Sequence, residues 1–251
     1  MRVVLSRLFS GSWQPTPSVM RQGHGLVDPG EHGLHFVRTA RTPDPTWRPH
    51  LVSSRRWTGR WISSQVGRGP YEAKLCRRED LVLFVARLHE GACAKDCPPG
   101  SGRDVICSYL AIAEVVPVAR GVRTPSWMAP YYVEIHETMV DWDDPINVVL
   151  CAPVSATWND RIPGAGHFLF ADDSLVLTRP GARHAGEWSL PGAFRGARIT
   201  GEYDSEVSPW AEWGFDAGPG AVDFFADGSR EARRWAEELV DRNAARGLTA
   251  P

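Results

Sequence analysis

The sequence predicts an α+β protein of one domain, residues 1–251, in which a mixed or barrel-like β-sheet core is closed by a C-terminal packing helix. Two apolar runs, 81–88 and 105–116, predict the central strands, because both are rich in β-branched and aromatic residues and contain no glycine or proline. The third observation is the helical spacing of apolar residues over 229–246. No linker divides the chain.

The two central runs set the expected layout of the core. Their hydrophobicity is nearly continuous, which is typical of strands covered on both faces. The run 105–116 is longer than a typical strand of about 5–6 residues, so we expect it to bend or to cross a barrel corner. Between the runs, residues 98–102 have the composition of a loop.

The other elements follow in order along the chain. Strands are expected at 2–9, 34–38, 146–152, 167–170, 174–178 and 221–225, and a hairpin turn at 171–173. Residues 10–33 have loop composition, and the two prolines around Asp44 predict a rigid turn. In the final helix, Trp235 anchors the apolar face, and Asp227 or Ser229 caps the start.

Composition indicates a globular, cytoplasmic protein. The chain is 43% hydrophobic and 23% charged, and no apolar run approaches the ~20 residues of a membrane span. The five cysteines are expected to be reduced thiols. Residues 1–80 hold 13 basic and 6 acidic residues, whereas 81–251 hold 15 and 24. The basic part is almost all arginine, which suits bidentate contacts with phosphates or carboxylates, or is simply an arginine-rich surface.

Motifs for common cofactors are absent from the sequence. It contains no Walker A loop, no G-x-G-x-x-G fingerprint and no G-x-S-x-G elbow, and it identifies no cofactor. If helical, His89, Cys93 and Cys97 would share one face, but no CxxC pair supports a zinc site and we predict no metal. The acidic runs 141–144 and 202–204 are either exposed loops or acid–base pairs.

Aromatic and histidine side chains offer further candidates. Of the 11 tryptophans, we expect Trp188, Trp210 and Trp235 in the core. The residues in arginine-rich surroundings are candidates for stacking on a base: Trp13, Trp57, Trp61 and Trp127. His167 follows a tight glycine-rich entry into a strand and is either a site residue or a hydrogen-bonded structural histidine.

Several segments, taken in their order along the chain, carry a family resemblance. They are 3–7, 10–12, 17–18, 43–45, 80–84, 110–115, 147–152, 175–178, Gly181, Arg183 and 188–191. Together they resemble the third family of nucleotide modification associated domains of bacteria and phages. Three departures stand out: Thr42 replaces a histidine, residues 86–87 replace a Gly-Trp pair, and no histidine follows near 199–204. If those histidines are catalytic in the family, this member is altered or inactive.

The resemblance implies a role in making or handling modified bases. We expect Arg7, Asp44 and Arg183 to meet in one pocket as catalytic residues, since they match its motifs. An Arg–Asp pair can also orient a second arginine toward a phosphate; the alternative is a structural salt bridge between loops. The candidate substrate contacts are Ser6, Gln65, Trp61, Asn147 and His167.

Three classes of function remain open from the sequence. The first is a small enzyme with a substrate pocket that modifies nucleotides or nucleic-acid bases. The second is a non-catalytic reader that stacks a flipped base, because the strands ending at 113–117 also look like small β-barrel readers of modified bases. The third is a structural or partner-binding protein. The expected partner is a nucleotide or nucleic acid rather than a membrane, and the sequence identifies no protein partner.

Overall fold

The computed structural model describes sixteen parts of the chain, in some strands as backbone alone. They are residues 2–7, 34–36, 50–53, 61–65, 76–90, 102–117, 123, 148–153, 155–168, 173–195, 198–200, 210–212, 214–217, 223–227, 229–245 and 248–249.

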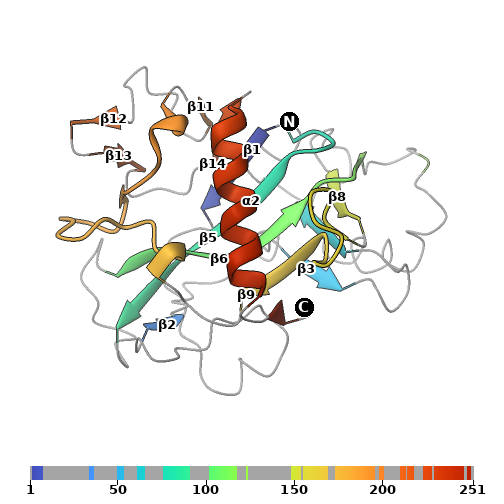
Figure 1. The fold of residues 1–251 in the computed structure, drawn as a ribbon, viewed down its shortest axis with the longest axis horizontal. Coiled ribbons are helices and arrows are strands. Elements are labelled where there is room, and N and C mark those ends of the chain that lie inside the picture. Colours follow the sequence, from blue (N-terminus) through green and yellow to red (C-terminus); the bar gives the residue numbers. More distant parts are fainter. Residues whose placement is uncertain are drawn as a thin grey trace.

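A mixed eight-stranded sheet forms the centre of the molecule (Figure 1). Its strands are β1 (Arg2–Arg7), β2 (Leu34–Phe36), β5 (Leu81–Glu90), β6 (Arg103–Ala111), β9 (Ala165–Phe168), β11 (Arg198–Thr200), β14 (Asp223–Asp227) and β15 (Leu248–Thr249). The order is β11-β14-β1-β5-β6-β9-β15, and β2 pairs with β5. The β1–β5 pair is parallel and the other pairs are antiparallel. The predicted mixed sheet is therefore confirmed.

The long run 105–116 bends out of this sheet, as its length predicts. β6 ends at Ala111, and β7 (Glu114–Pro117) joins a second sheet of four strands. That sheet has the order β3-β4-β8-β7, with β3 (His50–Ser53), β4 (Trp61–Gln65) and β8 (Val148–Ala152). One chain segment thus contributes a strand to each sheet.

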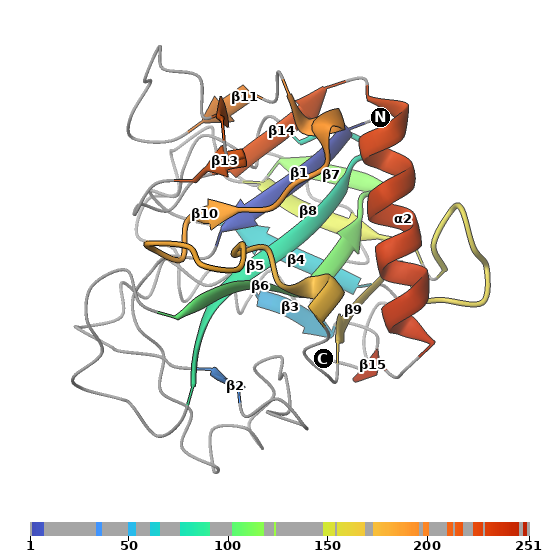
Figure 2. The ribbon, with the colours of Figure 1, turned by 60° about the vertical axis from the view of Figure 1, so that its left-hand side comes forward.

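The predicted C-terminal helix is α2 (Arg230–Ala244). Ser229 caps it, because its hydroxyl oxygen accepts a hydrogen bond of 3.1 Å from the Ala232 backbone N–H. In Figures 1 and 2 the helix runs alongside β1 and β5, and its apolar face is buried there. Trp235 is partly buried against the core and meets the ring of Phe194, in the 3₁₀ helix Gly192–Phe194, edge-on at 5.2 Å. No described helix is long and apolar enough to cross a membrane.

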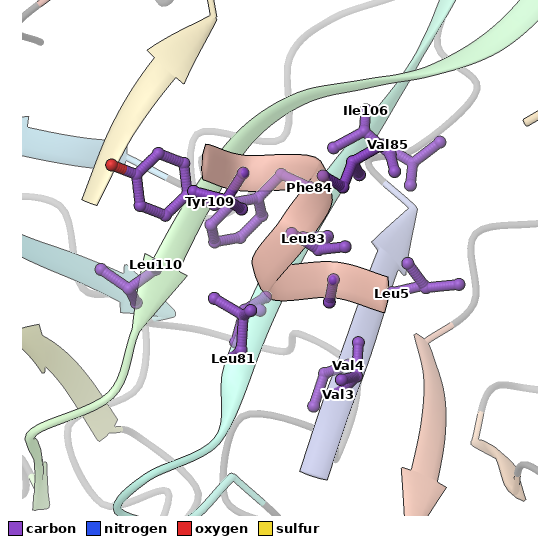
Figure 3. Packing of buried hydrophobic residues seen from close by; sticks show 14 of the residues in the cluster. Val3, Val4, Leu5, Leu81, Leu83, Phe84, Val85, Ile106, Tyr109 and Leu110 are labelled. Atoms are coloured by element: carbon purple, nitrogen blue, oxygen red, sulfur yellow. The ribbon is translucent and has the colours of Figure 1, made fainter. Parts of the chain in front are cut away.

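The core lies where β1, β5 and β6 run side by side (Figure 3). Leu83, Phe84, Ile112 and Leu177 are all buried, while for Val149, in β8, only the backbone is described. Tyr109 stacks on Phe168 and donates a 2.8 Å hydrogen bond to the Pro163 carbonyl. Burial raises the pKa of Tyr109, and the Asp241 carboxylate adds to this shift.

The segment 173–195 differs from the prediction of a strand over 174–178. Asp173–Leu175 forms a 3₁₀ helix, and only isolated bridges follow, from Val176 to Val105 and from Thr178 to Trp188. The reason lies in Asp104, whose carbonyl accepts from both Leu177 N and Thr178 N and so prevents a regular ladder.

A small three-stranded sheet follows that the sequence did not predict. Its strands are β10 (Glu187–Trp188), β13 (Gly214–Asp216) and β12 (Trp210–Ala211), and β13 lies in the middle. Gly214 has a φ of +140°, and a side chain there would place its Cβ 2.9 Å from the Trp188 carbonyl oxygen. This glycine therefore allows β13 to approach β10 closely.

Candidate functional site

A row of mostly polar positions crosses the eight-stranded sheet. Following the strand registers, the row is Thr200, Asp223, Ser6, Phe84, Ser108, His167 and Thr249. The neighbouring row, through Leu5, Leu83 and Tyr109, is apolar and belongs to the core. Two of the predicted contact residues thus lie in one row, three strand spacings apart, which is about 14 Å.

The β5–β6 pairing is irregular at this polar row. Phe84 pairs with Ser108 and Val85 pairs with Ile106, so that Cys107 is an extra residue on β6. Ser108 is buried, with 3% of its surface exposed. Such bulges bend a strand and are frequent beside active sites. The regular pairing of β5 and β6 is therefore interrupted at the polar row.

Three chain segments leave or enter the sheet at this row. β1 ends at Arg7, β11 ends at Thr200 and β14 begins at Asp223. We call this edge the Ser6 end of the sheet. The connecting segments 8–33, 201–209 and 218–222 lie outside the described residues, and segments in such positions often carry function.

The segment 176–188 lies at the same end of the sheet as Arg7. Arg7 pairs with Val85, whose partner on β6 is Ile106, and the next residue, Val105, bridges Val176. Only β5 and β6 therefore separate the end of β1 from Val176, where this segment begins, a span of about 10–15 Å.

Glu187 is the centre of an ionic cluster in this segment. Its side chain is fully buried, and its carboxylate accepts from Arg179 Nη2 at 2.5 Å and from Arg183 Nε at 2.7 Å. The Arg183 backbone N–H also donates to it, at 3.2 Å. Burial alone would raise the pKa of Glu187, but the hydrogen bonds from the two arginines hold that pKa below its usual value. The carboxylate is therefore charged at neutral pH.

Arg183 is anchored at one edge of its guanidinium and open at the other. Its side chain is 74% exposed. Nε is bound to Glu187, while Nη1 and Nη2 donate to none of the residues that the structure describes. His184 Nε2 lies 3.9 Å from a carboxylate oxygen of both Glu187 and Asp216, which is too long for a hydrogen bond. Among the described residues, no side chain or carbonyl occupies this outer edge of the guanidinium.

Asp104 and Trp188 hold the ionic cluster in place. The buried Trp188 indole donates to Asp104 Oδ2 at 2.9 Å and stacks on Phe215, with ring centroids 5.8 Å apart. The Thr178 hydroxyl accepts from Asp104 N at 2.7 Å and donates to the Ala185 carbonyl at 2.6 Å. Trp188 is fully buried, and Trp210 is partly buried against the core, as predicted for both.

The predicted site residues fall into four groups. Ser6, Arg7 and His167 lie in the eight-stranded sheet, placed by their backbone. Trp61 and Gln65 lie in β4 of the other sheet, where Gln65 pairs with Val148. Asp44 and Asn147 lie outside the described residues. Arg183 has a described side chain, but whether it meets Arg7 and Asp44 in one pocket stays a prediction.

The acid that orients Arg183 is Glu187, which the sequence prediction missed. The sequence offers Asp44 and the acidic runs 141–144 and 202–204 as candidate acids, and all of these lie outside the described residues. The usable signal was the four-residue spacing of Arg183 and Glu187 after the Gly181 turn, where φ is +71°. The role of Asp104 could not be predicted from local sequence, because its hydrogen-bond partner Trp188 is 84 residues away.

Metal binding finds no support among the described side chains, where no group of three His, Cys, Asp or Glu residues could hold an ion. His89 lies in a strand and pairs with His35, so the helix that would align it with Cys93 and Cys97 does not begin there. Cys93 and Cys97 themselves lie outside the described residues. Cys76 is buried and forms no disulfide bond with the other residues that the structure describes.

Comparison with protein families gives one match. The model of nucleotide modification associated domain 3 matches residues 65–231, more than half of the chain. The chain belongs to this family. The matched part includes the central strands, the Glu187 cluster and the start of α2. Comparison with curated proteins and with solved structures gave no match. The family description connects the chain with nucleotide modification, which agrees with the resemblance found in the sequence.

Proposed function

We propose that this chain is an enzyme that modifies nucleotides or nucleic-acid bases at the Ser6 end of the large sheet. The observation that carries the proposal is the geometry of Arg183. Its guanidinium is bound at Nε by the buried Glu187, and its side chain is 74% exposed. An arginine held in this way suits recognition of an anionic substrate. The family description supplies the class of substrate.

In the proposed site, Arg7 and Asp44 act with Arg183 on the substrate. Arg7 follows an apolar strand, so its charged group needs water, a carboxylate or an anionic ligand. Asp44 stands between two prolines, which restrict the backbone on both sides. Ser6 and His167 would contribute contacts from the polar row, and Trp61, Gln65 and Asn147 would contribute them from the second sheet and its entry.

The proposal treats residues 1–251 as one domain. β1 lies between β5 and β14, so the first and the last parts of the chain share one sheet. α2 then packs beside β1, and β15 pairs with β9. A division of the chain would expose the apolar surface of these strands, at a cost of about 25 cal/mol for each Å².

Mass spectrometry of nucleosides tests the proposal. DNA and nucleotide pools would be compared from cells without the gene and from cells with the wild-type gene, Arg183→Gln or Arg234→Gln. Arg234 is an exposed arginine on α2 and serves as the matched control. We expect a modified nucleoside with the wild type and with Arg234→Gln, and a loss of most of it with Arg183→Gln. Identical nucleoside profiles in all four samples would contradict the proposal.

A binding module without catalysis is the second candidate. It is favoured by the sequence departures from the family at Thr42 and near 199–204, where histidines are missing. Such a reader would bind nucleotides and leave the nucleoside profile of the cell unchanged. Binding by the purified protein together with an unchanged profile would therefore favour the reader over the enzyme.

A further inference from the structure

We infer that Glu187 and Arg183 form a phosphate-binding fork, so that the substrate is a phosphorylated nucleotide rather than a free base or nucleoside. This inference rests on the proposed function, because it assigns the ligand of the same site. It adds a role for Glu187, which positions Arg183 and does not touch the substrate. It also adds a substrate class, the nucleoside phosphates.

The geometry of the guanidinium supports the fork. A guanidinium has two edges that can each bind two oxygens: one formed by Nε with a terminal nitrogen, and one formed by the two terminal nitrogens. At the first edge, Arg183 Nε donates a hydrogen bond of 2.7 Å to the Glu187 carboxylate. The outer edge keeps two parallel N–H groups for a second anion, and this spacing matches two oxygens of a phosphate.

The buried carboxylate makes the fork rigid. Glu187 accepts from both the side chain and the backbone N–H of Arg183, which fixes the side chain near its root. The Arg179 N–H donates to the Glu187 carbonyl at 2.8 Å, which holds the strand that carries the carboxylate. A ligand therefore does not have to immobilise a free arginine, and preorganisation of this kind strengthens binding.

The local charge also favours an anion. Two guanidiniums, from Arg179 and Arg183, face the single carboxylate of Glu187. The Arg179 side chain is 27% exposed, so most of the outward positive charge lies on Arg183. Asp216 is the opposing acid; it is 40% exposed and reaches the cluster through His184 at 3.9 Å. The exposed charge of Arg183 therefore favours an anion at its outer edge.

Calorimetric titration of the purified chain tests the inference. The probes are the four 2′-deoxynucleoside 5′-monophosphates, the four nucleosides and an oligothymidylate of eight nucleotides without a terminal phosphate. We expect at least one monophosphate to bind wild type and Arg234→Gln about ten- to a hundredfold more tightly than its nucleoside. We expect Arg183→Lys to lose most of this preference, because lysine keeps the charge but not the fork.

Glu187→Gln tests the positioning role. If Glu187 acts through Arg183, the double variant with Arg183→Gln should bind monophosphates no more weakly than Arg183→Gln alone. Additive losses in the two single variants would overturn the positioning role. Since Glu187 is buried, folding of its variant is checked by circular dichroism, and Arg183→Lys, at an exposed position, tests the fork in any case.

The outcomes separate this inference from the proposed function. Equal affinity for nucleosides and monophosphates, or full binding by Arg183→Lys, would overturn the phosphate fork even if modified nucleosides are found in cells. Preference for the oligonucleotide over every monophosphate would assign the phosphate to nucleic acid and overturn the free nucleotide as substrate. A monophosphate preference with an unchanged nucleoside profile would support the fork and count against catalysis.

Discussion

The hydrogen bond between Trp188 and Asp104 allows a quantitative test of how the Glu187 cluster is held. Both side chains are fully buried, and the indole N–H donates to the carboxylate over 2.9 Å. Trp188→Phe keeps an aromatic ring against Phe215 but removes this donor. The change also weakens the support of Glu187, the residue beside Trp188 in β10.

The expected cost follows from two contributions. Loss of a buried hydrogen bond to a charged group costs about 1.5–3 kcal/mol. The smaller ring leaves unfilled volume, which adds roughly 1 kcal/mol. Trp188→Phe should therefore lower the free energy of unfolding by about 2.5–4 kcal/mol. For a chain of this size, the melting temperature should fall by roughly 5–16 °C.

Urea denaturation followed by circular dichroism measures this change, and Trp158→Phe is the matched control. Trp158 also donates to an aspartate, Asp241, at 3.0 Å, but both residues are only partly buried. The control should lose about 1 kcal/mol. In a double-mutant cycle with Asp104→Asn, the Trp188 change should cost less than it does alone. Equal losses of unfolding free energy in Trp188→Phe and Trp158→Phe would refute the claim that the buried Trp188–Asp104 hydrogen bond stabilises the segment 176–188.

Three further predictions concern the core, the backbone and pH. Leu83→Ala should destabilise the protein by about 2–5 kcal/mol, and a loss below ~1 kcal/mol in urea denaturation would contradict the central position of β5. Glu79 is exposed and has a φ of +74°, so Glu79→Gly should be neutral or stabilising by up to about 1 kcal/mol, whereas Glu79→Val should destabilise; thermal melts of both variants test this. The folded-state pKa of Glu187 is lowered, so its contribution to stability is complete above the unfolded-state pKa of about 4.3 and is lost as pH falls below it. The difference in melting temperature between wild type and Glu187→Gln should thus be largest near pH 7 and shrink in acid, and a constant difference would contradict the ion pairs.

The elements that the sequence predicted well are those with strong local patterns. The bend in 105–116 followed from length alone, since one strand rarely continues through so many apolar residues. The helix followed from its spacing and from the Ser229 cap. The small sheet was missed because β10 and β12 contain two residues each, too few for any periodicity to appear.

The site was less accessible to sequence reasoning, because its contacts join distant parts of the chain. The sequence motifs predict Arg183 as a site residue and Asp44 as its acidic partner. In the structure its partner is Glu187, four residues along the chain. Ser6 and His167 were selected for separate reasons, and only the strand registers place them in one row. Registers depend on pairing between remote segments, which a single sequence does not encode locally.

Nuclear magnetic resonance with a bound nucleotide tests the central claim most directly, namely that nucleotides bind at the Ser6 end of the large sheet. Each deoxynucleoside monophosphate would be added to ¹⁵N-labelled protein, and the shifts of backbone and arginine Nε signals would be mapped. The account predicts that the largest shifts fall at Ser6, Arg7, Asp223 and the 183–188 segment, with the Arg183 Nε signal among them. Shifts confined to the exposed face of α2, around Arg234, with the Arg183 signal unmoved, would contradict it.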